Sequence, residues 1–146
     1  MSDALHDDNQ HRRPHTPPMA GPFLEFDLMR ELELLHEEPE WNSGQNARTL
    51  VKYHDFRVVL TALKAHARQP GHQTKGRLSI QMLTGHILVR AEGRTFDLRT
   101  GSLLALDQCR RHEVEALEDS ALLLTIAWPG DDSEPHRPCS TPATRT

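Results

Sequence analysis

The sequence predicts an all-β fold of the sandwich or small-barrel class. Gly85, Gly93 and Gly101 recur every eight residues, and the stretches between them are rich in Ile, Leu, Val, Thr or Phe. Glycine adopts the positive φ that tight turns require, and about six residues between turns is the length of one strand. Several stretches also alternate apolar with polar residues, as half-buried strands do. Regularly spaced short strands of this kind are typical of a β-sandwich or barrel.

The length of 146 residues suits one folded domain with an unstructured segment at each end. Residues 1–22 and 129–146 are rich in proline and poor in large apolar side chains. Such segments cannot bury enough surface to offset the entropy lost on ordering, so we expect two disordered tails. Roughly a hundred residues remain, which is enough for one modest core.

The composition argues against nucleic acid and membrane as partners. The formal net charge is −4, and no clustered basic face is visible. No apolar run approaches the ~18 residues of a membrane span, and the Asp-containing start is not a signal peptide. Cys109 and Cys139 are the only cysteines, so we expect no disulfide framework and a cytoplasmic location.

A helix is predicted over residues 23–41. Its apolar positions recur at spacings of four, four and three residues and form one stripe: Leu24, Leu28, Leu32 and Leu35. Pro39 ends the pattern, because the residue before a proline is pushed out of the helical region. Two roles stay open for this helix. It can pack on the outside of the barrel as a strap, or it can form the contact of a homodimer.

The barrel is predicted over residues 46–128. A turn at 41–44 precedes it, and 67–76 is predicted to be a loop because it contains Pro70, Gly71 and Gly76. About eight strands are expected, which is the number in a double-sheet jelly roll. They are Thr49–Tyr53, Arg57–Ala65, Leu78–Leu83, His86–Ala91, Arg94–Leu98, Ser102–Leu106, His112–Ala116 and Ala121–Ala127.

The alternation predicts which side chains face the interior. Leu78, Ile80 and Met82 share one phase, so Gln81 points to the other face. Val114 shares an apolar phase with Ala116, and His112 has that phase too. An imidazole at the end of an inward row is the clearest chemical signal in the sequence.

Residues 46–128 resemble the cupin superfamily, specifically its small single-domain bacterial members. The runs that carry the resemblance are Leu63-Lys64-Ala65 leading to Pro70-Gly71-His72, Gln81-Met82-Leu83-Thr84-Gly85, Gly101–Leu106 leading to His112, and Ala121–Ile126. The resemblance implies a double-stranded β-helix, which is a jelly-roll barrel. It also implies a site in the barrel, because cupins typically bind a divalent transition metal through two motifs.

The second cupin motif supplies one histidine ligand and is partly present. Gly101 matches its leading glycine, and His112 matches its histidine, eleven residues later. The usual proline, glycine and asparagine of that motif are replaced by Asp107, Cys109 and Ala116. Its metal ligand is therefore kept, whereas its turn chemistry is changed.

The first cupin motif, a His-x-His pair followed by a glutamate, is depleted. His72 matches one histidine, while Pro70 takes the place of the other. Leu78 stands seven residues before Gly85, where the glutamate is expected. A catalytic metal site generally takes about three protein ligands. The resemblance thus leaves two imidazoles without a carboxylate.

The sequence therefore predicts a small-ligand-binding cupin, with a regulatory or stress-related role left open. His72 and His112 would be its polar anchors, and Leu78, Ile80, Met82 and Val114 would line the site. The cofactor is either none or a weakly held Fe, Mn, Ni or Zn ion on the two histidines. One alternative is a metal-dependent enzyme of the dioxygenase or isomerase type. Another is a partner-binding module that forms a homodimer.

The turn before His112 allows two further interpretations. Arg110 and Arg111 give Cys109 an electropositive setting in which a thiol could react. The same two arginines could steer an anionic ligand to the barrel mouth. The competing interpretation is a solvated turn with an incidental cysteine.

Overall fold

The computed structural model describes residues 19–129. The expected tails lie outside these residues, apart from 19–22 and Pro129. Before the strands come an α-helix, α1 (Leu28–Glu37), and a 3-10 helix, η1 (Pro39–Ser43). The strands are β1 (Gln45–Lys52), β2 (Phe56–Leu63), β3 (Arg68–His72), β4 (Arg77–Thr84), β5 (His86–Ala91), β6 (Arg94–Arg99), β7 (Leu103–Leu106), β8 (His112–Ala116) and β9 (Ser120–Ala127).

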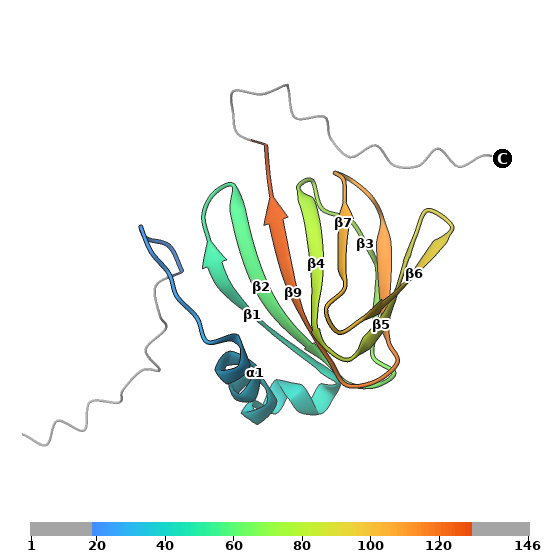
Figure 1. The fold of residues 1–146 in the computed structure, drawn as a ribbon, viewed down its shortest axis with the longest axis horizontal. Coiled ribbons are helices and arrows are strands. Elements are labelled where there is room, and N and C mark those ends of the chain that lie inside the picture. Colours follow the sequence, from blue (N-terminus) through green and yellow to red (C-terminus); the bar gives the residue numbers. More distant parts are fainter. Residues whose placement is uncertain (1–18, 130–146) are drawn as a thin grey trace, which may run out of the picture.

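The strands form two antiparallel sheets that pack face to face as a jelly roll (Figure 1). One sheet has five strands in the order β1-β2-β9-β4-β7, and the other has four in the order β3-β8-β5-β6. Successive strands from β2 to β9 mostly alternate between the sheets, which is the connectivity of a jelly roll. The all-β jelly-roll fold predicted from the sequence is confirmed.

The glycine-marked turns fold as predicted. Gly85, Gly93 and Gly101 have φ angles of 96°, 75° and 87°, which is the region that favours glycine. At Gly85 the surroundings add a second constraint. A Cβ there would lie 2.3 Å from Ser120 Oγ and 2.6 Å from the Asp119 carbonyl oxygen. The β4–β5 turn can therefore approach the start of β9 only because it lacks a side chain.

The main core lies between the two sheets. Its buried members come from β2, β4, β5, β6, β8 and β9: Leu63, Leu78, Ile80, Met82, Ile87, Val89, Leu98, Val114, Ala116 and Leu122. Side chains that alternate along each strand reach this core from one face only. Burial of these apolar side chains is the main source of the stability of the fold.

Helix α1 covers the outer face of the five-stranded sheet. Leu32 and Leu35 are its buried residues, and they pack on Leu50, Leu60 and Ala121 from β1, β2 and β9. The helix therefore has the position of a strap. It is shorter than the predicted range 23–41, because the Asp27 side chain caps it by accepting from the Arg30 backbone N–H at 3.2 Å.

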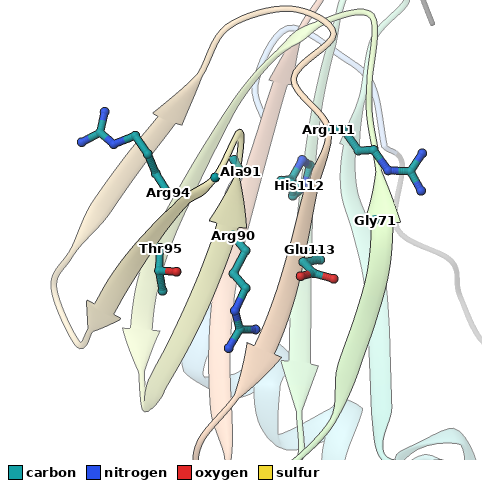
Figure 2. A pocket seen from close by; sticks show the side chains of 9 residues that line it. Gly71, Arg90, Ala91, Arg94, Thr95, Arg111, His112 and Glu113 are labelled. Carbon is teal, nitrogen blue, oxygen red and sulfur yellow. The ribbon is translucent and has the colours of Figure 1, made fainter. Parts of the chain in front are cut away.

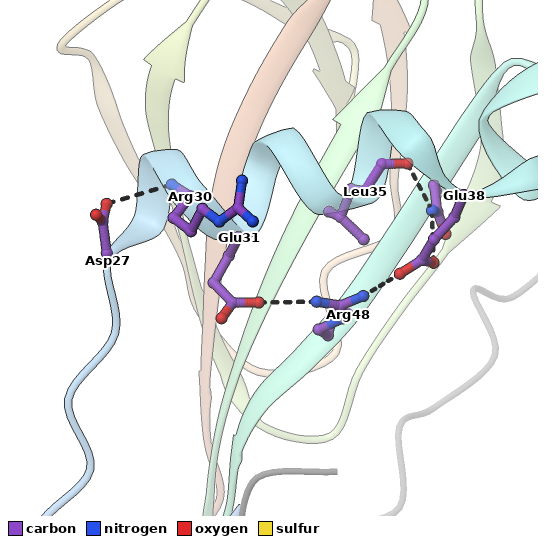
Figure 3. A network of polar contacts seen from close by, with 7 residues as sticks. Asp27, Arg30, Glu31, Leu35, Glu38 and Arg48 are labelled. Atoms are coloured by element: carbon purple, nitrogen blue, oxygen red, sulfur yellow. Dashed lines mark hydrogen bonds and ion pairs between the residues drawn. The ribbon is translucent and has the colours of Figure 1, made fainter. Parts of the chain in front are cut away.

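Polar contacts hold the helix at its place on β1 (Figure 3). The Arg48 guanidinium of β1 donates to Glu31 at 2.8 Å and also pairs with Glu38. The Asn46 amide donates to the Leu35 carbonyl oxygen at 3.0 Å and to Glu38 at 3.0 Å. These bonds satisfy one carbonyl in the last turn of α1 and fix the helix on the strand.

The structure corrects the sequence prediction in one segment. The range 67–76 was predicted to be a loop, yet Arg68–His72 forms β3 and pairs with β8. Pro70 and Gly71 discourage a central strand, but β3 lies at the edge of its sheet, where a proline is tolerated. The register also shifts between Gln69 and His72, as at a bulge. The structure therefore has nine strands within the described residues, one more than expected.

None of the helices within residues 19–129 is both long and apolar enough to cross a membrane.

Candidate functional site

The topology gathers the candidate residues at one end of the jelly roll. β3 and β9 end here, and β2, β4 and β8 begin here (Figure 1). We call it the histidine end, made of residues 52–57, 72–78, 91–94, 106–112 and 126–128. In the four-stranded sheet, His72, His112 and Ala91 are successive register partners there.

His72 and His112 lie side by side. Their ring centroids are 4.3 Å apart, and the ring planes are tilted by 59°. His112 is buried with 3% of its surface exposed, whereas His72 is exposed. The inward phase predicted for His112 is that of the buried Val114 and Ala116. The structure thus brings together the two imidazoles that the sequence singled out.

Both rings are oriented by backbone carbonyls. His72 Nδ1 lies 3.1 Å from the Pro70 carbonyl oxygen, and His112 Nδ1 lies 3.3 Å from that of Arg110. A carbonyl oxygen only accepts, so Nδ1–H donates in each contact and each Nε2 is left to a ligand. Burial lowers the pKa of His112, and the nearby His72 lowers it further, while the Arg110 carbonyl opposes both. His112 is therefore neutral at pH 7.

A cavity of about 480 Å³ opens beside His112, at the rim of the four-stranded sheet (Figure 2). Residues from the ends of β3, β5, β6 and β8 line it: Gly71, Arg90, Ala91, Gly93, Arg94, Thr95, Arg111, His112 and Glu113. Three of these side chains are guanidinium groups and one is a carboxylate. The cavity wall thus carries excess positive charge next to a neutral imidazole.

The arginines of this wall are placed by different contacts. Arg90 donates to Glu115 at 3.0 Å, and this bond holds the pKa of Glu115 below its usual range. Arg94 lies with its guanidinium carbon 5.0 Å from the Phe96 ring centroid. Arg111 lies over Gly71, where a Cβ would come within 2.8 Å of its Nε. Arg94 and Arg111 make no ion pair within residues 19–129.

The apolar residues expected to line the site are part of the core. Leu78, Ile80 and Met82 are buried on β4, and Val114 is buried on β8. Val114 also borders a second cavity of about 280 Å³, which is lined mainly by outward side chains of β3 and β8. Gln81 is exposed on the other face of β4, as the alternation predicts.

The donor set at the histidine end does not fit a catalytic metal ion. Within the described part of the chain, no group of three or more His, Cys, Asp or Glu side chains is arranged to hold one. Leu78 is buried where the carboxylate is expected. Two imidazoles alone fall short of the usual three protein ligands.

Cys109 does not carry the free thiol that reactive chemistry requires, because it is disulfide-bonded. Cys139, the other cysteine of the sequence, lies outside the described residues. The expected cytoplasmic location relied in part on the absence of disulfides, and Cys109 does not support that argument. Arg110, which was considered as a steering cation, pairs with Glu92 at 2.7 Å.

Sequence reasoning missed two arginines at the histidine end and one beside it. Arg94 follows the β5–β6 turn, Arg57 begins the inner row of β2, and Arg90 lies on β5 just before the histidine end. The alternation Arg94-Thr-Phe-Asp-Leu98 could have placed Arg94 on the inner face of β6. Arg57 gave no such signal, because apolar residues follow it on both faces of β2.

Two antiparallel sheets in jelly-roll order, with paired imidazoles at one end, define a fold of the small β-barrel class. No family model matches the chain, and no curated protein matches it. Many solved structures do match. An RmlC-like cupin from Desulfovibrio desulfuricans is 25% identical, covers 59% of this chain and 84% of its own, and has a TM-score of 0.54. The chain therefore contains a cupin domain.

Two further structures show the same fold in different settings. A conserved Streptococcus pyogenes protein of unknown function is 19% identical over 77% of this chain and 94% of its own, with a TM-score of 0.61. A variant of salicylate 1,2-dioxygenase from Pseudoaminobacter salicylatoxidans is 16% identical over 76% of this chain, with a TM-score of 0.67. This chain spans 36% of the dioxygenase. The likeness to both is one of fold.

Proposed function

We propose that this chain is a small-molecule-binding cupin whose ligand sits at the histidine end. The observation that carries the proposal is the His72–His112 pair, with ring centroids 4.3 Å apart and each Nδ1 held by a backbone carbonyl. Pre-oriented rings leave two Nε2 atoms as polar anchors for a ligand. The cavity of about 480 Å³ beside His112 is within the size range of small-molecule sites.

A metal-dependent cupin enzyme is the second candidate, because the solved structures that share this fold include a dioxygenase. The two imidazoles are the part of a metal site that the chain retains. Leu78 is buried at the position where the glutamate ligand is expected, and this argues against a complete metal site. We therefore expect Zn²⁺, Fe²⁺, Mn²⁺ or Ni²⁺ to bind weakly at His72 and His112, with no turnover of substrate.

The test uses two-dimensional NMR on the ¹⁵N-labelled full chain with four probes that share one ring: benzoate, benzamide, phenol and benzylamine. At least one probe should shift the amide signals of His72, Ala91 and His112, while those at Gly85 and Gly101 stay unchanged. The variant H72A/H112A should lose this response. H36A is the matched control, because His36 is exposed on helix α1, outside the histidine end.

Two outcomes would overturn the proposal. One is that no probe shifts the signals of the histidine end, or that the shifts scatter over the whole surface. The other concerns the metal: near-stoichiometric metal in protein purified without chelators, lost in H112A, would favour the enzyme instead. Elemental analysis of the untreated protein measures this directly.

A further inference from the structure

Arg57 faces the interior of the jelly roll at the histidine end. Its register partner on β9 is Ile126, which pairs in turn with Leu78 on β4. Ile126 and Leu78 both pack in the core between the sheets, and register partners share a face. The row Arg57–Ile126–Leu78 therefore lines the inner face of the five-stranded sheet at the end where His72 and His112 line the other sheet.

The guanidinium of Arg57 has no polar partner within residues 19–129. Its Nε is shielded from solvent and makes no hydrogen bond, and the side chain forms no ion pair there. Its one contact of note is with Trp128, whose ring centroid lies 5.3 Å from the guanidinium carbon. A shielded, unpaired donor of this kind costs stability, so a partner is expected to complete it.

The surroundings define which partner fits. A guanidinium is always charged and presents a planar fork that matches a carboxylate. The neighbours of Arg57 in its row, Ile126 and Leu78, are aliphatic, so the body of the ligand should be apolar. Across the interior, the Arg110 carbonyl accepts from the Nδ1–H of His112, so the Nε2 of His112 is left as an acceptor. An acceptor at this position offers no hydrogen bond to a second anionic group, so a single carboxylate is expected.

We propose that the ligand is a small monocarboxylic acid with an apolar body, whose carboxylate is bound by Arg57. This rests on the proposed function and names its substrate class. Arg94 and Arg111 line the cavity beside His112 and add positive charge at the same end of the barrel. They would raise the local concentration of an anion before it reaches Arg57.

The experiment compares benzoate with benzamide, its uncharged analogue, and butyrate with butyramide. Binding to the full chain is followed by NMR titration of the histidine-end amides. Each carboxylate should bind at least about tenfold more tightly than its amide, because a hydrogen bond to a charged group is stronger than one to a neutral group. R57M should lose this preference, and R57K should keep only part of it.

R99M is the matched control, because Arg99 lies on the outer face of β6 beside Asp97. It should bind carboxylates as the wild type does. A second readout separates ligand binding from a structural role. Since the Arg57 guanidinium has no polar partner among the described residues, R57M should melt at the same temperature as the wild type or higher, and added benzoate should raise the melting temperature of the wild type only.

The outcomes are distinguishable from failure of the proposed function. Equal binding of carboxylates and amides at the histidine end would overturn the role of Arg57 and leave the ligand site standing. If R57M binds neither the carboxylates nor the amides and also has a lower melting temperature, Arg57 is a structural residue and the proposal is contradicted. Inorganic phosphate that competes as well as benzoate would also contradict it, by showing that charge alone is recognised.

Discussion

The middle of the jelly roll and its histidine end are built from the same strands but have opposite chemistry. In the middle, Ile80, Met82 and Val89 fill the space between the sheets with aliphatic side chains. Two to four residues further along, the inward positions are held by Arg57, His112 and their neighbours. Strand geometry alone dictates that both sets face inward.

This difference shows that inward residues in the middle of a strand stabilise the fold, whereas inward residues at the histidine end do not. An aliphatic side chain at an inward position gains by burial, whereas an imidazole or guanidinium at such a position loses hydration that its few hydrogen bonds only partly replace. The polar residues of the histidine end therefore lower the stability of the fold, or add little to it. The proposed ligand site would account for their presence at inward positions.

The largest expected effect comes from the middle. I80A should lower the free energy of unfolding by about 2–5 kcal/mol, because Ile80 is fully buried and truncation leaves a cavity. Urea unfolding measures this loss. L103A is the control and should change the stability by less than about 0.5 kcal/mol, since 66% of Leu103 is exposed. Equal losses in the two variants would contradict the assignment of the core.

A smaller effect is expected from pH at the histidine end. The pKa of His112 is lower in the folded chain than its ordinary value, so the unfolded chain binds the proton more readily. Stability from this group is thus full above pH of about 6.5 and falls as the pH drops through the folded pKa. The adjacent His72 contributes to this lowering of the His112 pKa, because positive charges on neighbouring rings repel each other.

The variant H112L should therefore melt at the same temperature as the wild type or higher at pH 7.5. Its melting temperature should also fall less than that of the wild type when the pH is lowered, and we call this fall the acid-side decrease. Thermal melts between pH 5 and 8, read by circular dichroism, make this comparison. H54L is the control for removal of a histidine and should retain the decrease. An unchanged acid-side decrease in H112L would show that another group is responsible.

The smallest effect on stability is expected at the rim. In G71A the added Cβ would come within 2.8 Å of Arg111 Nε, but this atom belongs to a flexible side chain that can move. We expect a change in the free energy of unfolding of less than about 1 kcal/mol, together with NMR shifts at Arg111 and His112. G85A offers the contrast, because its Cβ would meet the backbone at Asp119 and its φ is positive. A greater loss in G71A than in G85A would contradict this distinction.

Several features of the fold could be predicted because local and global signals agree. The turns at Gly85, Gly93 and Gly101 need positive φ, and β4 and β8 have one buried face each, so their alternation is visible. The same alternation placed Leu78 and His112 on the inner face. The resemblance to the two cupin motifs paired His112 with His72, and the structure brings these two rings into contact.

Other features could not be predicted from the sequence, because they depend on contacts between distant parts of the chain. β3 carries Pro70 and Gly71, which local propensity assigns to a loop, and only its place at a sheet edge permits them. β2 has apolar residues on both faces, because the core covers one and helix α1 covers the other. This hides the alternation, and with it the inward direction of Arg57. The rim cavity depends on how the β5–β6 turn meets β8, which is a long-range arrangement.

The central claim is that the inner face of the histidine end binds a small ligand between Arg57 and the two imidazoles. A crystal structure of the full chain grown with benzoate tests it most directly. The claim predicts a bound molecule with its carboxylate on the Arg57 guanidinium and its body near His72 and His112. Benzoate bound elsewhere, or an Arg57 turned outward with aliphatic side chains closing the space, would contradict it.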